Sequence, residues 1–250
     1  MNLALIGGEE FADGFEDVHA DLLATAGGAR SRGVFLVTAA AEDGTNVINY
    51  WRELSVRRLS VGGATVSAPP VIDSASANDA ANVRLIDEAD WLYLGGGKPH
   101  VALGILHNSA VQDAILRAAQ AGKLILGASA GAMMMCAQSV VLTDAALATF
   151  QRALRNPVEG QTPSLPPVTC LGLVPKCLCA PHFERSYARQ MEIGFRTVGL
   201  TILGIDEQTA MHTVDGEHWL VRGRARIVVI PPQHEPHTYH AGMEFTLPAG

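Results

Sequence analysis

The feature that most restricts the fold is a serine held on a tight turn directly after an apolar run. The segment Gly127-Ala128-Ser129-Ala130-Gly131 follows the apolar residues 124–126 and spells G-x-S-x-G. At such a turn a strand reverses into a helix with the serine at its apex, in a strained conformation that exposes the hydroxyl. The glycines lack the Cβ atoms that would collide there. The pattern predicts a buried strand followed by a helix, although a packed turn without chemistry is the alternative in a chain rich in Ala and Gly.

Length and composition favour one domain with a large core. The chain has 250 residues, of which 48% are hydrophobic, and this is enough for a single buried core. The formal net charge is -7, from 18 Lys and Arg against 25 Asp and Glu. An acidic chain without a basic cluster is unsuited to bind nucleic acid or an anionic membrane surface. The sequence therefore predicts one catalytic α/β domain over residues 1–250 and no nucleic-acid partner.

Compartment is predicted from the N-terminus, the longest uncharged stretch and the cysteines. The first ten residues carry no basic charge before their apolar run, so they indicate a buried strand rather than a signal peptide. Residues 124–143 are uncharged, but their Gly, Ser and Gln residues favour a buried strand and helix over a membrane span. Four cysteines are too few for a disulfide framework. We expect a cytoplasmic protein without membrane contact.

Two groups of side chains have the chemistry of metal ligands. Cys177 and Cys179 would share one side of a strand, with His182 close behind, but the C-x-x-C spacing of zinc sites is missing. The three histidines within residues 234–240 straddle a proline and cannot share one helix face. No metal and no other cofactor is predicted.

Short apolar runs alternate with longer amphipathic segments in the first half of the chain. This alternation is typical of a parallel sheet covered by helices. The predicted strands are 3–6, 33–37, 91–94 and 124–126, and the predicted helices are 15–26, 49–59 and 110–121. We expect a three-layer, flavodoxin-like α/β fold, with a mostly parallel central sheet and helices on both faces.

The second half of the chain begins with a proline-rich segment. Residues 143–169 contain four prolines in their second half, which predicts a loop that could reach over an active site. Further strands are predicted near Cys177 and at 203–205, 209–214, 218–221 and 226–230. The turn Asp215-Gly216 suits a hairpin, so antiparallel strands are expected at one end of the sheet.

A glycine loop is the second candidate for chemistry. Gly95-Gly96-Gly97 follows the predicted strand 91–94. Loops at the carboxyl ends of neighbouring parallel strands gather in one crevice, so this loop and the serine turn can meet. The backbone N–H groups of Gly96 and Ala130 are then a plausible oxyanion hole. An ordinary glycine turn is the alternative, and the spacing does not fit a nucleotide-binding fingerprint.

A serine nucleophile needs a base and an acid that orients the base. His182 follows an apolar strand, and Asp206 and Glu207 follow another, so all three lie at strand ends. Each alone could be structural. Three strand-end groups in the order serine, histidine, acid favour catalysis, while the residues leave the choice between the two acids open.

Four segments in this order resemble the serine peptidase family that includes dipeptidase E and cyanophycinase, which has the class I glutamine amidotransferase-like fold. The segments are Leu92 to Gly97, Gly127 to Ala132, Pro181 to Phe183 and Gly204 to Ala210. The resemblance covers most of the chain. It implies Ser129 as nucleophile, His182 as base and Glu207 as acid, with Asp206 and Asp144 as alternative acids.

The chain departs from the family pattern near the substrate. Lys98 stands where an amide or acidic residue is usual after the glycine loop, and Ala180-Pro181 replaces the pair that precedes the histidine in cyanophycinase. Cyanophycin is therefore not the expected substrate. Gly97, Lys98 and Arg185 are the candidate substrate-binding residues, and Lys98 could pair with an acidic substrate group.

The primary hypothesis is a serine hydrolase that cleaves small peptides or isopeptides through an acyl-enzyme. One alternative is an α/β-hydrolase esterase that uses Ser129, Asp206 and His234. Another is a non-catalytic binding module on the same fold. Homodimer formation is left open.

Overall fold

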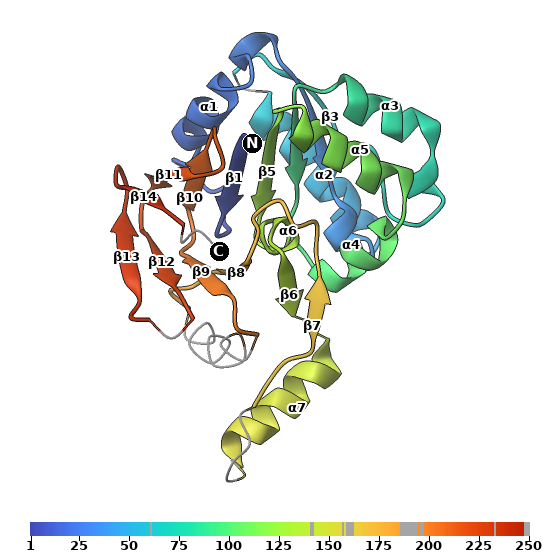
Figure 1. Ribbon diagram of the computed structural model, residues 1–250. Coiled ribbons are helices and arrows are strands. Elements are labelled where there is room, and N and C mark those ends of the chain that lie inside the picture. The colour runs from blue at the N-terminus through green and yellow to red at the C-terminus, as the bar shows by residue number, and fades with distance from the viewer. Residues whose placement is uncertain are drawn as a thin grey trace.

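The computed structural model describes residues 1–60, 62–140, 143–156, 158, 163–185, 195, 198–232 and 234–247. Its centre is an eight-stranded sheet with the strand order β14-β11-β10-β1-β5-β4-β2-β3 (Figure 1). The strands are β1 (Leu3–Ile6), β2 (Arg32–Leu36), β3 (Thr65–Ser67), β4 (Trp91–Leu94), β5 (Leu124–Ala128), β10 (Thr209–Thr213), β11 (His218–Gly223) and β14 (Glu244–Thr246).

Strands β1, β5, β4, β2 and β3 are parallel to one another. On the other side of β1 the pairing is antiparallel, from β1 to β10, from β10 to β11 and from β11 to β14. The predicted mostly parallel sheet with an antiparallel end is confirmed. Strand β1 lies in the middle of the sheet, between the parallel strand β5 and the antiparallel strand β10. All four of its residues are buried, as expected for a strand that is covered on both faces.

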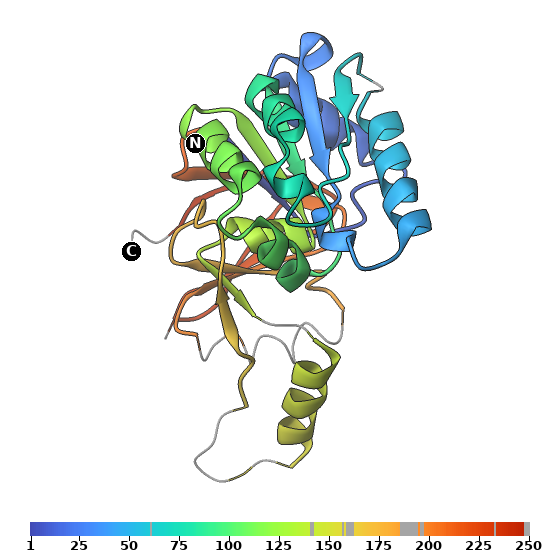
Figure 2. The ribbon, with the colours of Figure 1, turned by 90° about the vertical axis from the view of Figure 1, so that its right-hand side faces the viewer.

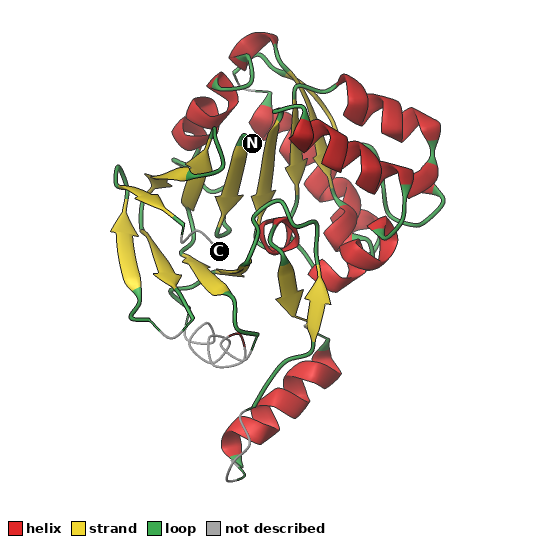
Figure 3. Ribbon diagram, viewed as in Figure 1, coloured by secondary structure: helices red, strands yellow, loops and turns green. Residues whose placement is uncertain are grey.

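Helices cover both faces of this sheet, as Figures 2 and 3 show. Side chains alternate along a strand, so Ala4 and Ile6 of β1 enter one core and Leu3 and Leu5 enter the other. The first core is closed by α1 (Glu16–Ala24) and α2 (Thr45–Leu59). The second is closed by α3 (Ala80–Glu88), α4 (Pro99–Leu106), α5 (Ala110–Gln120) and α6 (Ala130–Met135). Within the described ranges, every helix is too short or too polar to span a bilayer.

The C-terminal strands are divided between two sheets. A four-stranded sheet has the order β13-β12-β9-β8, formed by β8 (Cys177–Pro181), β9 (Thr201–Ile205), β12 (Arg226–Ile230) and β13 (His237–His240). Backbone bonds from His182 N to Gly7 O and from Gly7 N to Thr209 O, each 3.0 Å, join its end to β1 and β10. The chain therefore brings the ends of β8, β9, β1 and β5 to one place.

The segment 143–169 contains a helix that the sequence did not predict. Its first half forms α7 (Asp144–Arg155), which extends away from the sheet in Figures 1 and 2. Its last residues form β7 (Pro167–Thr169), which pairs with β6 (Gln138–Val140). The expected loop falls in part on residues outside the described ranges, so its path over an active site stays a prediction.

Candidate active site

The serine turn has the geometry that its glycines predict. Ser129 lies between β5 and α6 with φ 51° and ψ -114°, a strained conformation for a residue with a side chain. A Cβ on Gly127 would lie 2.6 Å from the carbonyl carbon of Gly131, and a Cβ on Gly131 would overlap the carbonyl oxygen of Leu94. Only glycine lets strand and helix cross this closely, and the crossing fixes the hydroxyl at the end of the strand.

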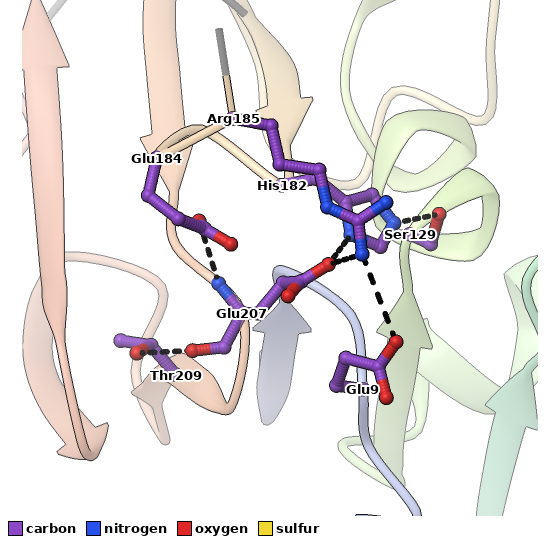
Figure 4. Close-up of polar contacts among 7 residues, drawn as sticks. All are labelled: Glu9, Ser129, His182, Glu184, Arg185, Glu207 and Thr209. Atoms are coloured by element: carbon purple, nitrogen blue, oxygen red, sulfur yellow. Dashed lines mark hydrogen bonds and ion pairs between the residues drawn. The ribbon is translucent and has the colours of Figure 1, made fainter.

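His182 directly follows β8, and its ring faces the serine. Ser129 Oγ lies 3.0 Å from His182 Nε2, as Figure 4 shows. The backbone of His182 is anchored by its bond to Gly7 O, and it has a positive φ of 52°. A Cβ on Gly8 would overlap the imidazole, so the glycine leaves the space that the ring occupies.

The acid beside His182 is Glu207, which follows β9 by two residues. His182 Nδ1 lies 2.6 Å from Glu207 Oε1. Asp206, the neighbouring candidate, pairs with a different residue, since Arg226 Nε donates to its Oδ2 at 3.2 Å. Asp144 is the first residue of α7, a helix that Figure 1 shows extending away from the central sheet. Of these three carboxylates, all within the described ranges, only Glu207 contacts the imidazole.

Charges around Glu207 favour its ionised form. Burial raises the pKa of Glu207, but the hydrogen bond from His182 and the positive charge of Arg185 outweigh it, so the pKa is lowered. Arg185 Nη2 contacts Glu207 Oε1 and lies 3.7 Å from Glu9 Oε1 (Figure 4). The carboxylate of Glu184 accepts from the backbone N–H of Glu207 at 3.0 Å. Arg185, one of the candidate substrate-binding residues, therefore holds the acid.

Two backbone N–H groups close to Ser129 are candidates to bind an oxyanion. The loop at Gly96 lies against the serine, since a Cβ built there would be 3.5 Å from Ser129 Cβ. Ala130 is the first residue of α6, where helix amides have no intrahelical acceptor. Among the described residues, neither amide donates a hydrogen bond to a protein acceptor. Both N–H groups are therefore free to bind a substrate oxygen.

The residues after the glycine loop are fixed by the backbone. A Cβ on Gly97, which has φ 133°, would overlap the Ala39 carbonyl oxygen, and Lys98 N donates to that oxygen at 2.7 Å. The Lys98 amine lies 3.5 Å from Asp43 Oδ1 and 3.6 Å from Glu42 Oε2. The Lys98 amine, the expected partner of an acidic substrate group, is thus already close to two carboxylates of the protein.

A cavity of about 440 Å³ opens beside Ser129. It is lined by Glu9, Glu10, Phe11, Ala12, Phe35, Val37, Ala40, Asp43, Tyr50, Trp51, Leu54, Gly96, Gly97, Ser129 and His182. Sequence reasoning did not find the acidic and aromatic residues of this lining. The available signal was the pair Glu9-Glu10 after β1, because the carboxyl end of a central parallel strand faces the ligand crevice.

Glu10 is the most unusual group of the cavity. Its side chain is only 8% exposed. Burial raises the pKa of Glu10 from 4.5 to about 7, and the negative charge of Glu9 adds to the effect. The buried carboxyl therefore holds its proton in the folded protein at pH values where it is ionised in the unfolded chain.

Stability should respond to this group in a defined pH window. Because the folded pKa of Glu10 exceeds the unfolded value, its contribution to the free energy of unfolding is full below pH 4.5 and is lost as pH rises through 7. The Glu10→Gln variant cannot ionise at this position and should not show this loss. The free energy of unfolding of the variant minus that of wild type should therefore rise by up to about 3 kcal/mol between pH 4.5 and pH 8.

Urea unfolding at pH 4.5 and pH 8 measures the change. The exposed helix residue Glu53 provides the matched control, since Glu53→Gln removes a carboxylate from the surface instead of the cavity. An identical pH dependence for Glu10→Gln and wild type would contradict the raised pKa.

A serine, a histidine and a carboxylate joined in this order by hydrogen bonds, at the strand ends of an α/β sheet, have the arrangement of serine hydrolases. The comparison with protein families agrees: residues 3–221 match peptidase family S51. The chain belongs to this family, and it is therefore a serine-type peptidase. This finding confirms the family that the four sequence segments predicted.

Solved structures share the fold. A peptidase from an acI-B1 Actinobacterium superposes with a TM-score of 0.80 at 22% identity, covering 98% of this chain and 96% of that one. A candidate peptidase E protein from Listeria monocytogenes EGD-e gives a TM-score of 0.60 at 19% identity, covering 90% of this chain and 98% of that one. No curated protein matches the sequence. At these identities the structural likeness describes the fold alone.

Proposed function

We propose that the protein hydrolyses small peptides or isopeptides through an acyl-enzyme on Ser129. The observation that supports this most is the unbroken chain of contacts from Ser129 Oγ through His182 to Glu207, at 3.0 Å and 2.6 Å. The cavity beside Ser129 has room for one or two amino-acid residues, which favours a short substrate over a folded protein. A cytoplasmic location remains a prediction from the sequence, and homodimer formation remains open.

Acylation follows from the positions of the three side chains. Ser129 Oγ attacks the scissile carbonyl carbon while its proton moves to His182 Nε2. The oxyanion that forms accepts hydrogen bonds from the N–H groups of Gly96 and Ala130. Collapse of the intermediate breaks the C–N bond, and the proton on Nε2 passes to the leaving amine.

Deacylation uses the same groups in reverse. Water attacks the ester carbonyl, gives its proton to His182 Nε2, and the C–O bond to Ser129 breaks as that proton returns to Oγ. The carboxylic acid product is released. Throughout, Glu207 accepts the hydrogen bond from Nδ1–H and stabilises the imidazolium, while Arg185 keeps Glu207 ionised and in place.

Covalent labelling tests the nucleophile directly. An organophosphonate probe should add one phosphonyl group to the wild-type protein, located on Ser129 by peptide mass spectrometry, because phosphonates trap activated serines. Ser129→Ala should give no adduct. Ser74→Ala, which removes a hydroxyl from an exposed loop residue, should label like wild type. Labelling that persists in Ser129→Ala would remove Ser129 from this role.

The esterase alternative is not favoured by the geometry. His234 is an exposed residue after β12 whose backbone N–H bonds to Pro231 O at 3.4 Å. No hydrogen bond joins its ring to Ser129 or Asp206 within the described ranges, whereas His182 contacts both Ser129 and Glu207.

A further inference from the structure

The cavity beside Ser129 is lined by acidic side chains. Glu9, Glu10 and Asp43 contribute carboxylates to its lining, and among the described residues no Lys or Arg lines it. Two of these acids have cations nearby, since Arg185 Nη2 lies 3.7 Å from Glu9 and Lys98 Nζ lies 3.5 Å from Asp43. Among the described residues, Glu10 is therefore the one acid of the lining without a cation close to it.

Glu10 differs from the other two acids because it is buried without a partner. Its side chain is 8% exposed and lines the cavity. Its carboxyl group accepts a hydrogen bond from the N–H of its own backbone. No other described residue donates a hydrogen bond to this carboxyl group or forms an ion pair with it. Ionising a buried carboxyl without a counter-charge is costly, so Glu10 keeps its proton in the empty cavity, and a cation beside it would make the ionised form favourable.

Aromatic rings complete the lining. Phe11, Phe35, Tyr50 and Trp51 all face the cavity, and Phe11 lies 6.4 Å from Trp51 and 6.1 Å from Phe35 between ring centroids. The faces of such rings attract cations, particularly when a carboxylate is close. Rings and carboxylate together form a site for a cation carried on an apolar stem.

We propose that this cavity binds a cationic group of the substrate, an ammonium or a guanidinium, through the carboxylate of Glu10. The inference rests on the proposed peptidase function, because the cation must belong to a molecule whose scissile carbonyl reaches Ser129. An acidic substrate group would instead find no Lys or Arg in the described lining of the cavity. The site therefore selects positively charged peptides and disfavours acidic ones.

Three substrate pairs, each differing by a single charge, locate the cation. The first compares lysine with norleucine before the scissile bond, the second a free with an acetylated α-amino group, and the third lysine with norleucine after the scissile bond. Each kcat/KM is measured for wild type, Glu10→Gln and the surface control Glu53→Gln. Thermal unfolding checks that all three proteins are folded.

At least one pair should show a preference of about 10- to 100-fold for the charged member, as expected for a charge-assisted hydrogen bond. Glu10→Gln should reduce that preference to less than about threefold by slowing the charged substrate only, because its amide cannot supply the charge. Glu53→Gln should keep the full preference. The substrate pair whose preference falls in Glu10→Gln shows whether the bound cation is the α-ammonium or a basic side chain.

Absence of any cationic preference in wild type, or a preference that persists in Glu10→Gln, would overturn the proposal. Hydrolysis of the neutral substrates serves a separate purpose. If wild type cleaves acetylated norleucine substrates and Ser129→Ala does not, the peptidase function stands whatever the outcome for Glu10.

Discussion

Replacing His182 by alanine should lower kcat on an activated ester or a short peptide by about 10⁶-fold, since removal of the base alone silences a serine hydrolase. The imidazole is the group within 3.0 Å of Ser129 Oγ that can take its proton. A serine hydroxyl barely ionises without such a base, so binding and the oxyanion donors alone give only residual catalysis. Steady-state kinetics with purified protein measures the loss, and circular dichroism checks the fold.

The matched control is His234→Ala, which removes an imidazole from an exposed residue after β12. Its activity should equal that of wild type. If His234→Ala were inactive and His182→Ala active, His234 would be the base, in the order serine, acid, histidine of the α/β-hydrolases. The assignment of His182 would then be wrong.

The Glu207→Gln variant should lose about 10⁴-fold in kcat with little change in fold, by analogy with the loss of the orienting carboxylate in serine proteases. Glu207 Oε1 accepts from His182 Nδ1 at 2.6 Å, which holds the proton on Nδ1 and leaves Nε2 free to accept. A neutral amide can instead donate to Nδ1, which stabilises the wrong tautomer, and it no longer stabilises the imidazolium. Single-turnover acylation rates give the most direct measurement.

Two conservative variants test the other acids. Asp206→Asn changes the neighbouring carboxylate, which pairs with Arg226, and Asp144→Asn changes the first residue of α7. Both should retain most of the acylation rate. A loss in Asp206→Asn as large as that in Glu207→Gln, with the fold intact, would contradict the assignment of Glu207.

The first half of the fold followed closely from local patterns. Strands β1 and β4 begin and end where the apolar runs predict, and β5 extends the predicted strand by two residues to Ala128. Continuous apolar runs have few alternatives to a buried parallel strand once helices with amphipathic spacing separate them. The helices α3, α4 and α7 were not predicted.

The second half was less predictable because strand pairing there is non-local. Strand β9 pairs with β8 and β12, whereas β10 pairs with β1 from the beginning of the chain. These strands are short and mostly buried, and nothing in their sequences indicates the partner of each strand. The division of the C-terminal strands into two sheets therefore emerged only from the packed structure.

The serine turn, the glycine loop and the strand-end positions of His182, Asp206 and Glu207 can be read from the chain, because each depends on a few neighbouring residues. That Glu207, rather than Asp206 or Asp144, contacts His182 followed from the packing of distant segments. This packing also placed Glu10 at the cavity and Lys98 against Glu42 and Asp43. Ser129 and His182 are 53 residues apart, and such contacts depend on side-chain directions and distances between distant segments. Local propensity does not encode these distances, since they are fixed when the segments pack together.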